Sequence, residues 1–395
     1  MVVPLAGRVV AAVVGGLLIL SACRSMITTI IVPRPATGWL TRTVDWLVKC
    51  TFQLVTAPVG RRLHDLKNPS AGIITYRRRD RILAGQAPTI LLAQLIAWLA
   101  IFFVGFALLI WPFVPGGITT AFNTVGPGLW FIGTAHVTGA GERTIQDIAA
   151  VTGLITITLQ IAYLPTLYAA FNRRETDIAL LNARAGVPSW GPELLARTHY
   201  ALGSGASTVD TLPDLYAQWE RFGADIAESH TTYLPLVRFR SPRPLSSWVT
   251  ALLAVMDSAA LYLSLSPEAA PSVPARLCLR SGFQCLDEIA AAMRLKVPET
   301  ADPDAGISLT YAEFLDAVQR MRDVDFPLER TAEEAWPDFV GWRVNYEQAA
   351  YAIAYAIEAV PALWSGPRRR PYPPIPPIRP AAGRVPKEKK RKISR

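Results

Sequence analysis

The sequence has little of what enzymes and metal sites need. Its 395 residues include only 4 His and 4 Cys, with no CxxC pair and no histidine at metal-ligand spacing from a cysteine. Walker and GxGxxG motifs are absent, and no histidine stands in a recognised pattern with a nucleophilic serine or cysteine. We therefore expect no enzymatic activity, no bound metal and no cofactor.

Charged residues are also scarce, and they are unevenly placed. They make up 18% of the chain against 51% hydrophobic residues, and the mean hydropathy is +0.25. This composition is too apolar for an average soluble protein and too charged for a bundle lying wholly in a membrane. By our count, residues 33–88 carry +7, residues 174–365 carry −10 and residues 366–395 carry +10. The net charge of +9 thus arises from a linker and a tail, and we do not expect nucleic-acid binding.

Two of the few cysteines stand close together. Cys278 and Cys285 are seven residues apart, which places them on one face of an expected helix. A redox pair would suit that spacing, but a pair of buried thiols is the commoner arrangement. We predict buried thiols.

Three long apolar runs are present, and each is long enough to cross a hydrocarbon core of about 30 Å. They extend from Ala6 to Val32, from Thr89 to Phe113 and from about Ile145 to Phe171. The second has no charged residue in its whole length. We predict three transmembrane helices.

Basic residues in the short loops set the orientation. The linker from Pro33 to Pro88 has ten of them, whereas the loop from Val114 to Thr144 has only Arg143. Because Lys and Arg resist translocation, the linker is expected in the cytoplasm. This predicts a multi-pass protein of the cell membrane with an external amino terminus and a cytoplasmic carboxyl-terminal region. The arginines of the linker's RRRDR cluster are expected to face anionic lipid of the inner leaflet: Arg77, Arg78, Arg79 and Arg81.

A different topology follows if the first run is a lipoprotein signal. Leu20 to Cys23 matches the pattern that precedes a lipidated cysteine, but it would export the basic linker. The linker itself contains apolar residues at helical spacing between Gly38 and Val55, with Trp39 and Trp46. Such a helix either lies on the inner leaflet or packs on the cytoplasmic domain.

Beyond Arg174 the pattern is that of short helices broken by proline and glycine, which predicts an all-α cytoplasmic domain. Expected helices cover residues 176–185, 191–202, 211–231, 247–265, 273–293, 309–323 and 342–363. The run from Ser246 to Ser266 could be a fourth span, but the central Asp257 would cost about 2.5 to 3.5 kcal/mol in a membrane. We interpret it as a core helix.

The last thirty residues, Gly366 to Arg395, are rich in proline and basic residues and are expected to be disordered. Three partners suit this tail: an SH3-like groove for PPIPPIRP, anionic lipid for KEKKRK, or the chain's own acidic domain.

The stretch between the second and third runs is too rich in glycine to be another span. It reads FNTVGPGLWFIGTA, from Phe122 to Ala135, and resembles a pore loop in position. A filter at Thr124 to Gly128 leaves too few residues for a pore helix before it. A filter at Phe131 to Ala135 leaves room for a short re-entrant helix from about Ile118 to Trp130. Segment lengths favour the second register.

The third run carries a polar stripe at helical spacing: Thr152, Thr156, Gln160 and Tyr163. Such a stripe lines a water path in some membrane proteins and joins helices by hydrogen bonds in others. Pro165 follows and removes one helical hydrogen bond, so it is a candidate hinge.

Several stretches together resemble a known family. They are RSMITTIIVPRP, TYRRRDRILA, AFNTVGPGLWFIGTA, QIAYLPTLYAAFNRRETDIALLNARAG and ESHTTYLPLVRFRSPRPLSSWVTALLAVMDSAALYL, within Arg24 to about Leu363. They are similar to bacterial membrane proteins of the two pore domain potassium channel family, also described as ion-channel-like. The resemblance implies a pore helix, a filter and a homotetramer that conducts a monovalent cation.

Laid on this chain, the family's filter glycine falls on Gly133 and the preceding small residue on Gly126. The filter segment then comprises Phe131, Ile132, Gly133, Thr134 and Ala135. Phe131 lacks the hydroxyl that would bind the ion, and Ala135 replaces a glycine that a filter needs for its left-handed turn. The resemblance thus implies the architecture more strongly than potassium selectivity.

These observations predict an all-α integral membrane protein with three transmembrane helices, a re-entrant pore-like loop between the second and third, and a cytoplasmic helical domain. The expected divisions are residues 1–33 for the first helix, 34–88 for the linker, 89–172 for the pore-like domain, 173–365 for the helical domain and 366–395 for the tail. The expected function is a channel-like pore. The alternative is a non-conducting anchored interaction or sensory protein.

Overall fold

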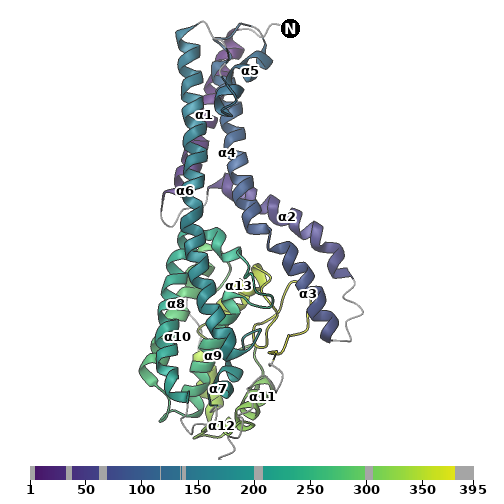
Figure 1. Ribbon diagram of the computed structural model, residues 1–395, viewed down its shortest axis with the longest axis vertical. Coiled ribbons are helices and arrows are strands. Elements are labelled where there is room, and N and C mark those ends of the chain that lie inside the picture. The colour runs from purple at the N-terminus through teal and green to yellow at the C-terminus, as the bar shows by residue number, and fades with distance from the viewer. Residues whose placement is uncertain are drawn as a thin grey trace, which may run out of the picture. The chain divides into compact units, whose positions relative to one another are not determined.

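The computed structural model describes residues 5–32, 38–61, 69–115, 117–133, 135, 139–199, 208–298 and 306–378 (Figure 1). Every regular element in these ranges is a helix, and the only strand-type pairings among them are two isolated β-bridges. The all-α class predicted from the sequence is therefore confirmed. The chain divides into two compact units.

Unit 1 comprises Met1–Asp65, Arg78–Arg173 and Glu228–Arg240. Its helices are α1 (Leu5–Ile30), α2 (Trp39–Arg61), α4 (Gln86–Ile110), α5 (Ile118–Leu129) and η3 (Leu234–Arg238). It also holds the last residues of α3 (Pro69–Leu83) and the greater part of α6 (Ala140–Ala185). The α6 helix continues through Pro165 without interruption, so the expected span and the following cytoplasmic helix are one element.

Helices α1 and α4 pack closely because each has a glycine at their crossing. A Cβ atom added to Gly15 would collide with the backbone of Gly105, and one added to Gly105 would lie 2.8 Å from the Ile19 side chain. Small residues at such a crossing let two helix backbones approach each other within a membrane. A buried hydrogen bond of 3.2 Å from Trp98 Nε1 to Ser25 Oγ joins the same pair of helices.

Four helical stretches are long and apolar enough to cross a membrane: Ala6–Ile30, Ile73–Ile110, Ala140–Ala185 and Trp248–Leu265. The second of them covers most of α3 together with α4. The first three include most of each of the three apolar runs of the sequence. The fourth is helix α9 (Trp248–Leu265), and all of its residues are buried within the protein. Since α9 has no face left for lipid, its burial supports the interpretation as a core helix.

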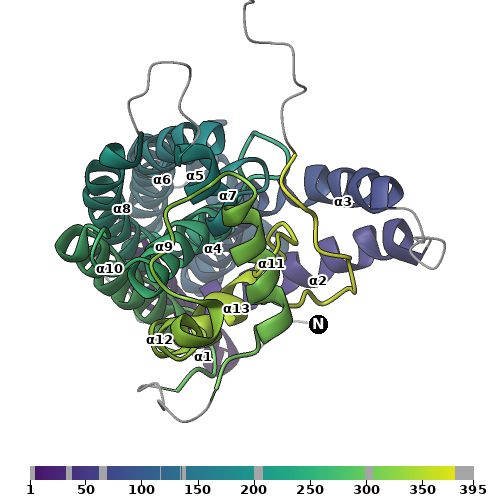
Figure 2. The same cartoon turned by 90° about the horizontal axis from the view of Figure 1, so that it is seen from below.

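Unit 2 comprises Leu66–Arg77, Arg174–Ala227 and Ser241–Arg395. Helix α9 lies at its centre, and α7 (Gly191–His199), α10 (Ser272–Ala292), α12 (Ala332–Arg343) and α13 (Glu347–Ala356) pack around it (Figure 2). The other helices are η2 (Thr208–Thr211), α8 (Leu212–Thr232), which ends in unit 1, and α11 (Tyr311–Arg322). Thr310 and Thr331 begin α11 and α12 with capping boxes.

The largest error in the predicted helices concerns residues 342–363. Only α13 (Glu347–Ala356) lies within this range, and α12, which was not predicted, ends at Arg343 just after the expected start. The break has a local cause, because the Asn345 side chain donates to the carbonyls of Gly341 and Trp342 and so caps the end of α12. Helix α12 contains Pro337, a residue that is unfavourable inside a helix.

The two neighbouring cysteines behave as predicted. Cys278 and Cys285 are free thiols, fully buried on α10, and burial raises the pKa of both well above that of an exposed thiol.

The expected start of the disordered tail, Gly366, requires correction. Residues up to 378 pack on unit 2: Ile375 is buried, Tyr372 stacks edge to face on Tyr76, and Ile378 pairs with Val187. Apolar contacts hold this segment, whereas the opposite charges of the tail and the acidic domain suggested an electrostatic attachment. Residues 379–395, with the basic KEKKRK block, lie outside the described residues.

Candidate functional site

The segment between α4 and α6 turns back along α4. Phe103, in the middle of α4, stacks with Phe122 at a ring-centroid distance of 5.0 Å and with Trp130 at 6.2 Å. Between these two residues, a Cβ atom added to Gly126 would lie 3.5 Å from the Phe103 ring. Helix α5 therefore runs beside α4 instead of extending beyond its end.

The end of α5 lies against the interior of α6. A Cβ atom added to Gly153 would be 2.5 Å from the Leu129 carbonyl oxygen, and one added to Gly128 would be 3.5 Å from the Ala150 Cβ atom. Gly153 is thirteen residues into α6, which corresponds to about 20 Å along the helix axis. The expected short helix at residues 118–130 is thus present, with its carboxyl end well down the bundle.

The chain then returns beside α6, and Gln146 holds both arms of this turn. Its side-chain amide donates to the carbonyl of Thr124 at 3.2 Å and to that of Ala135 at 3.4 Å, and the residue is only 4% exposed. Sequence reasoning missed Gln146. Its signal was an uncharged polar residue beside Asp147 at the start of an apolar run.

The residues predicted as a filter lie at the tip of this turn. Phe131 has a left-handed backbone with φ of 58°, and Gly133 has φ of 152° with open space around it. Phe131 and Ile132 are exposed, the latter to 82%, while Ala135 is half-buried. Thr134 lies outside the described residues. The tip therefore presents apolar side chains that its own chain does not cover.

The polar stripe of α6 mostly faces the protein itself. Thr156, Gln160 and Tyr163 are buried and Thr152 is half-buried. The two threonine hydroxyls donate to carbonyls one turn earlier in the helix, Thr152 to Ile148 at 2.8 Å and Thr156 to Thr152 at 2.7 Å. Burial inside one chain favours the packing role of the stripe over a role in lining a path shared between copies.

Around Pro165, α6 is gripped by residues Tyr233–Arg240, which we call the clasp. Tyr233 stacks on Tyr163 at a ring-centroid distance of 5.5 Å, before the proline. Phe239 contacts Phe171 at 5.5 Å and Tyr168 at 5.8 Å, after the proline. The clasp thus holds both sides of the residue predicted as a hinge. It was not predicted from the sequence.

Two arginines fasten the clasp to the linker helices. Arg238 forms an ion pair with Asp45 of α2 at 3.4 Å, and Arg240 forms one with Asp80 of α3. The clasp also contributes Leu236 to an apolar cluster with Ala87 and Leu91 of α4.

Of the four linker arginines expected to face lipid, Arg79 is buried within the protein. Arg79 is 2% exposed and donates to the Thr56 carbonyl at 3.4 Å, so it joins α3 to α2. Arg77, Arg78 and Arg81 are exposed. The spacing explains the difference, because Arg79 falls on the helix face opposite to that of its neighbours.

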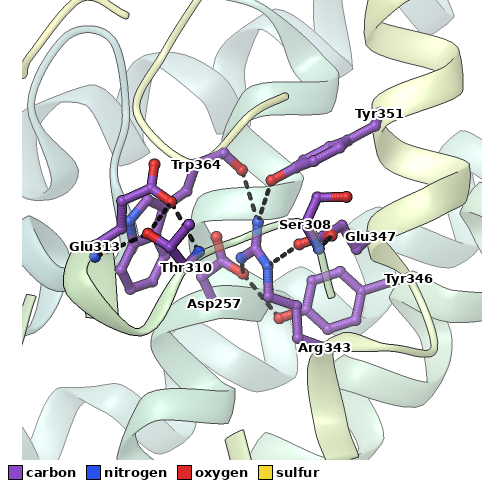
Figure 3. Close-up of polar contacts among 9 residues, drawn as sticks. All are labelled: Asp257, Ser308, Thr310, Glu313, Arg343, Tyr346, Glu347, Tyr351 and Trp364. Carbon is purple, nitrogen blue, oxygen red and sulfur yellow. Dashed lines mark hydrogen bonds and ion pairs between the residues drawn. The ribbon is translucent and has the colours of Figure 1, made fainter. Parts of the chain in front are cut away.

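Unit 2 contains a buried cluster of charges centred on Arg343 (Figure 3). Its guanidinium group pairs with Asp257 of α9 and with Glu347 of α13, the latter at 2.6 Å. It also donates to the Trp364 carbonyl at 2.7 Å and to the Tyr351 hydroxyl at 2.9 Å. A fully buried arginine thereby joins α9, α12, α13 and the carboxyl-terminal segment.

Burial disfavours the charged form of Asp257 in this cluster. One guanidinium faces two carboxyl groups, and burial raises the pKa of Asp257 to about 6, although Arg343 and the Tyr346 hydroxyl oppose the shift. Asp257 thus takes up a proton on folding between about pH 4, its unfolded pKa, and pH 6.

We therefore expect the contribution of Asp257 to stability to fall as the pH rises from about 4 to 6 and to be constant above that. Urea unfolding of the wild type and of Asp257→Asn, measured across this range, tests the expectation. The difference in unfolding free energy between them should change with pH only inside the window. A difference that changes mainly above pH 7 would contradict it.

The part of the chain that the structure describes has no group of three His, Cys, Asp or Glu residues placed to hold a metal. Comparison of the chain with protein-family models, curated proteins and solved structures found no match. The family resemblance noted in the sequence therefore stays a prediction.

Proposed function

We propose that the protein is a multi-pass protein of the cell membrane in which α4, α5 and α6 form a channel-like pore element. In this proposal the amino terminus is external, four copies assemble around an axis, and the pore conducts a monovalent cation under control of unit 2. The observation that carries it is the course of α5, which runs back beside α4 and ends against Gly153 of α6.

The depth of α5 follows from the apolar run of α6. If that helix enters the hydrocarbon core near Ile145, Gly153 lies about 12 Å inside, at ~1.5 Å per residue. Non-helical backbone at such a depth persists only where protein or water satisfies its polar groups. Gln146 supplies two of these hydrogen bonds. The exposed tip at Phe131 and Ile132 is left to be covered by further copies of the chain.

Ion flux from liposomes tests the proposal. Purified protein is reconstituted with potassium or sodium inside, and the leak is compared with that of Gly133→Val, which strains the backbone at the tip. Gly306→Val is the matched control, because Gly306 also has a positive φ, of 66°, and open space around it, but lies in unit 2.

A pore requires a leak in the wild type and in Gly306→Val, and loss of the leak in Gly133→Val. Equal leaks in all three proteins would show that the tip does not form the path. No leak in any of them supports the alternative below.

The second candidate is a non-conducting anchored interaction or sensory protein with the same scaffold. Two observations favour it: the polar stripe of α6 is buried within its own chain, and the tip carries Phe131 where a filter needs a hydroxyl group. Anionic lipid at the exposed arginines Arg77, Arg78 and Arg81, and a lipid or SH3-like partner of the tail, fit either candidate.

A further inference from the structure

Helix α2 has three faces, and two of them are occupied. Leu40, Val44 and Val48 are buried in the apolar cluster that α4 shares with the end of α1. On a second face, Thr56 accepts from Arg79 of α3, and the Phe52 ring lies 3.7 Å from a Cβ atom added to Gly85. These contacts fix how the helix is rotated about its own axis.

The third face is apolar and uncovered. It carries two tryptophans seven residues apart, and therefore on one line of the helix, together with two leucines. Their exposed fractions are 59% for Trp39, 61% for Trp46, 51% for Leu47 and 73% for Leu54. This face is opposite the one that contacts α3. In Figure 1, α2 leaves the bundle obliquely with the end of α3 beneath it.

The chemistry of this face fits a phospholipid surface. Tryptophan is enriched at the boundary between lipid and water, where its ring is amphipathic. Only eight residues separate Trp39 from the end of α1, which is apolar and long enough to cross a membrane. The exposed Arg42 flanks the tryptophans and suits anionic headgroups.

The other side of α2 leads to the hinge. Asp45 holds Arg238, and Arg238 is part of the clasp whose Tyr233 and Phe239 grip α6 before and after Pro165. We propose that α2 is a lever that binds the anionic cytoplasmic leaflet with its third face and, through Asp45 and the clasp, sets the position of α6 around Pro165. This inference rests on the proposed membrane placement and not on conduction.

The first test locates the third face. Full-length protein with Cys23→Ser and Cys50→Ser is placed in phosphatidylethanolamine–phosphatidylglycerol vesicles and spin-labelled at Trp46→Cys or Leu54→Cys; the buried Cys278 and Cys285 stay unlabelled. Collisions with oxygen report lipid, and collisions with a water-soluble nickel chelate report solvent. Val13→Cys on α1 and Glu333→Cys on α12, both exposed, serve as lipid and water references.

We expect both α2 labels to favour oxygen over the chelate by several-fold relative to the water reference. Chelate accessibility equal to that reference would overturn the proposal. Labels that are immobile and protected from both reagents would also overturn it, since a protein surface would then cover the face.

The second test measures the coupling. Labels at Leu54→Cys and at Ala169→Cys on α6 give a distance by pulsed electron resonance, in vesicles of phosphatidylcholine alone and in vesicles with phosphatidylglycerol. We expect the mean distance to differ between the two lipids, and this response to disappear in Asp45→Asn but not in Asp338→Asn, whose carboxylate belongs to an exposed pair with Arg330. The same response in Asp45→Asn, or none in the parent protein, would overturn the lever. Because neither readout involves flux, a failed pore proposal would remain distinguishable.

Discussion

Arg343→Ala is expected to lower the free energy of unfolding of unit 2 by about 3 to 5 kcal/mol. The substitution leaves Asp257 and Glu347 as carboxyl groups in the interior without the guanidinium that pairs with both. It also removes the donors that reach the Trp364 carbonyl and the Tyr351 hydroxyl. A buried acceptor without a partner costs more than the lost bond itself.

Urea unfolding of the full chain in detergent, followed by tryptophan fluorescence, measures this loss. The matched control is Arg330→Ala, because Arg330 also pairs with a carboxylate, Asp338, but both side chains are exposed. Exposed pairs contribute about 0 to 1 kcal/mol, so the control should unfold almost as the wild type does. Equal losses in the two variants would mean that the buried cluster does not hold unit 2 together.

Gly153→Leu is the second substitution with a large expected effect, and it acts on the apolar bundle. A side chain at this position meets the backbone carbonyl of Leu129, which cannot rotate away. Either α5 separates from α6 or the helices shift, at a cost of about 1 to 3 kcal/mol or more. In the pore proposal the same change would displace the tip and close any path that the tip forms.

A disulfide reports the contact directly. In protein with Cys23→Ser and Cys50→Ser, Gly128→Cys and Ala150→Cys are placed where a Cβ atom on Gly128 lies 3.5 Å from that of Ala150, at the short end of disulfide geometry. We expect efficient oxidation in membranes, strongly reduced by Gly153→Leu. Gly16→Leu is the control, because Gly16 is on α1, another long apolar helix, and faces open space. Unchanged oxidation in Gly153→Leu would show that α5 does not rest on Gly153.

Local patterns in the sequence predicted the helices well. The three apolar runs were found by length and by lack of charge, which do not depend on what they pack against. The short helix expected from about Ile118 to Trp130 followed from the pore-like order of the segments and their lengths, and the structure has it at Ile118–Leu129. Threonine followed three residues later by glutamate marks the start of α12, a signal that the sequence analysis did not use.

The sites depend on pairs that no local pattern records. Asp257 and Arg343 are 86 positions apart, and Asp45 and Arg238 are 193 apart. In the sequence each of these residues is an isolated charge. Asp257 entered the sequence analysis only through the cost of placing it in a membrane. The clasp was likewise seen only as part of a stretch between two helices, since its role comes from the aromatic residues of α6 that it meets.

The ordered start of the tail has a consequence for any protein that recognises proline-rich peptides. Tyr372 and Ile375 are in contact with unit 2, so a reader domain competes with the chain's own surface for the same side chains. The domain can bind only molecules in which residues 366–378 have detached from unit 2. The apparent dissociation constant is therefore the intrinsic one divided by the fraction of molecules in that detached state. Conversely, a domain that binds this segment removes Ile375 from its apolar cluster, so Tyr76 of α3 and Leu245 lose that contact.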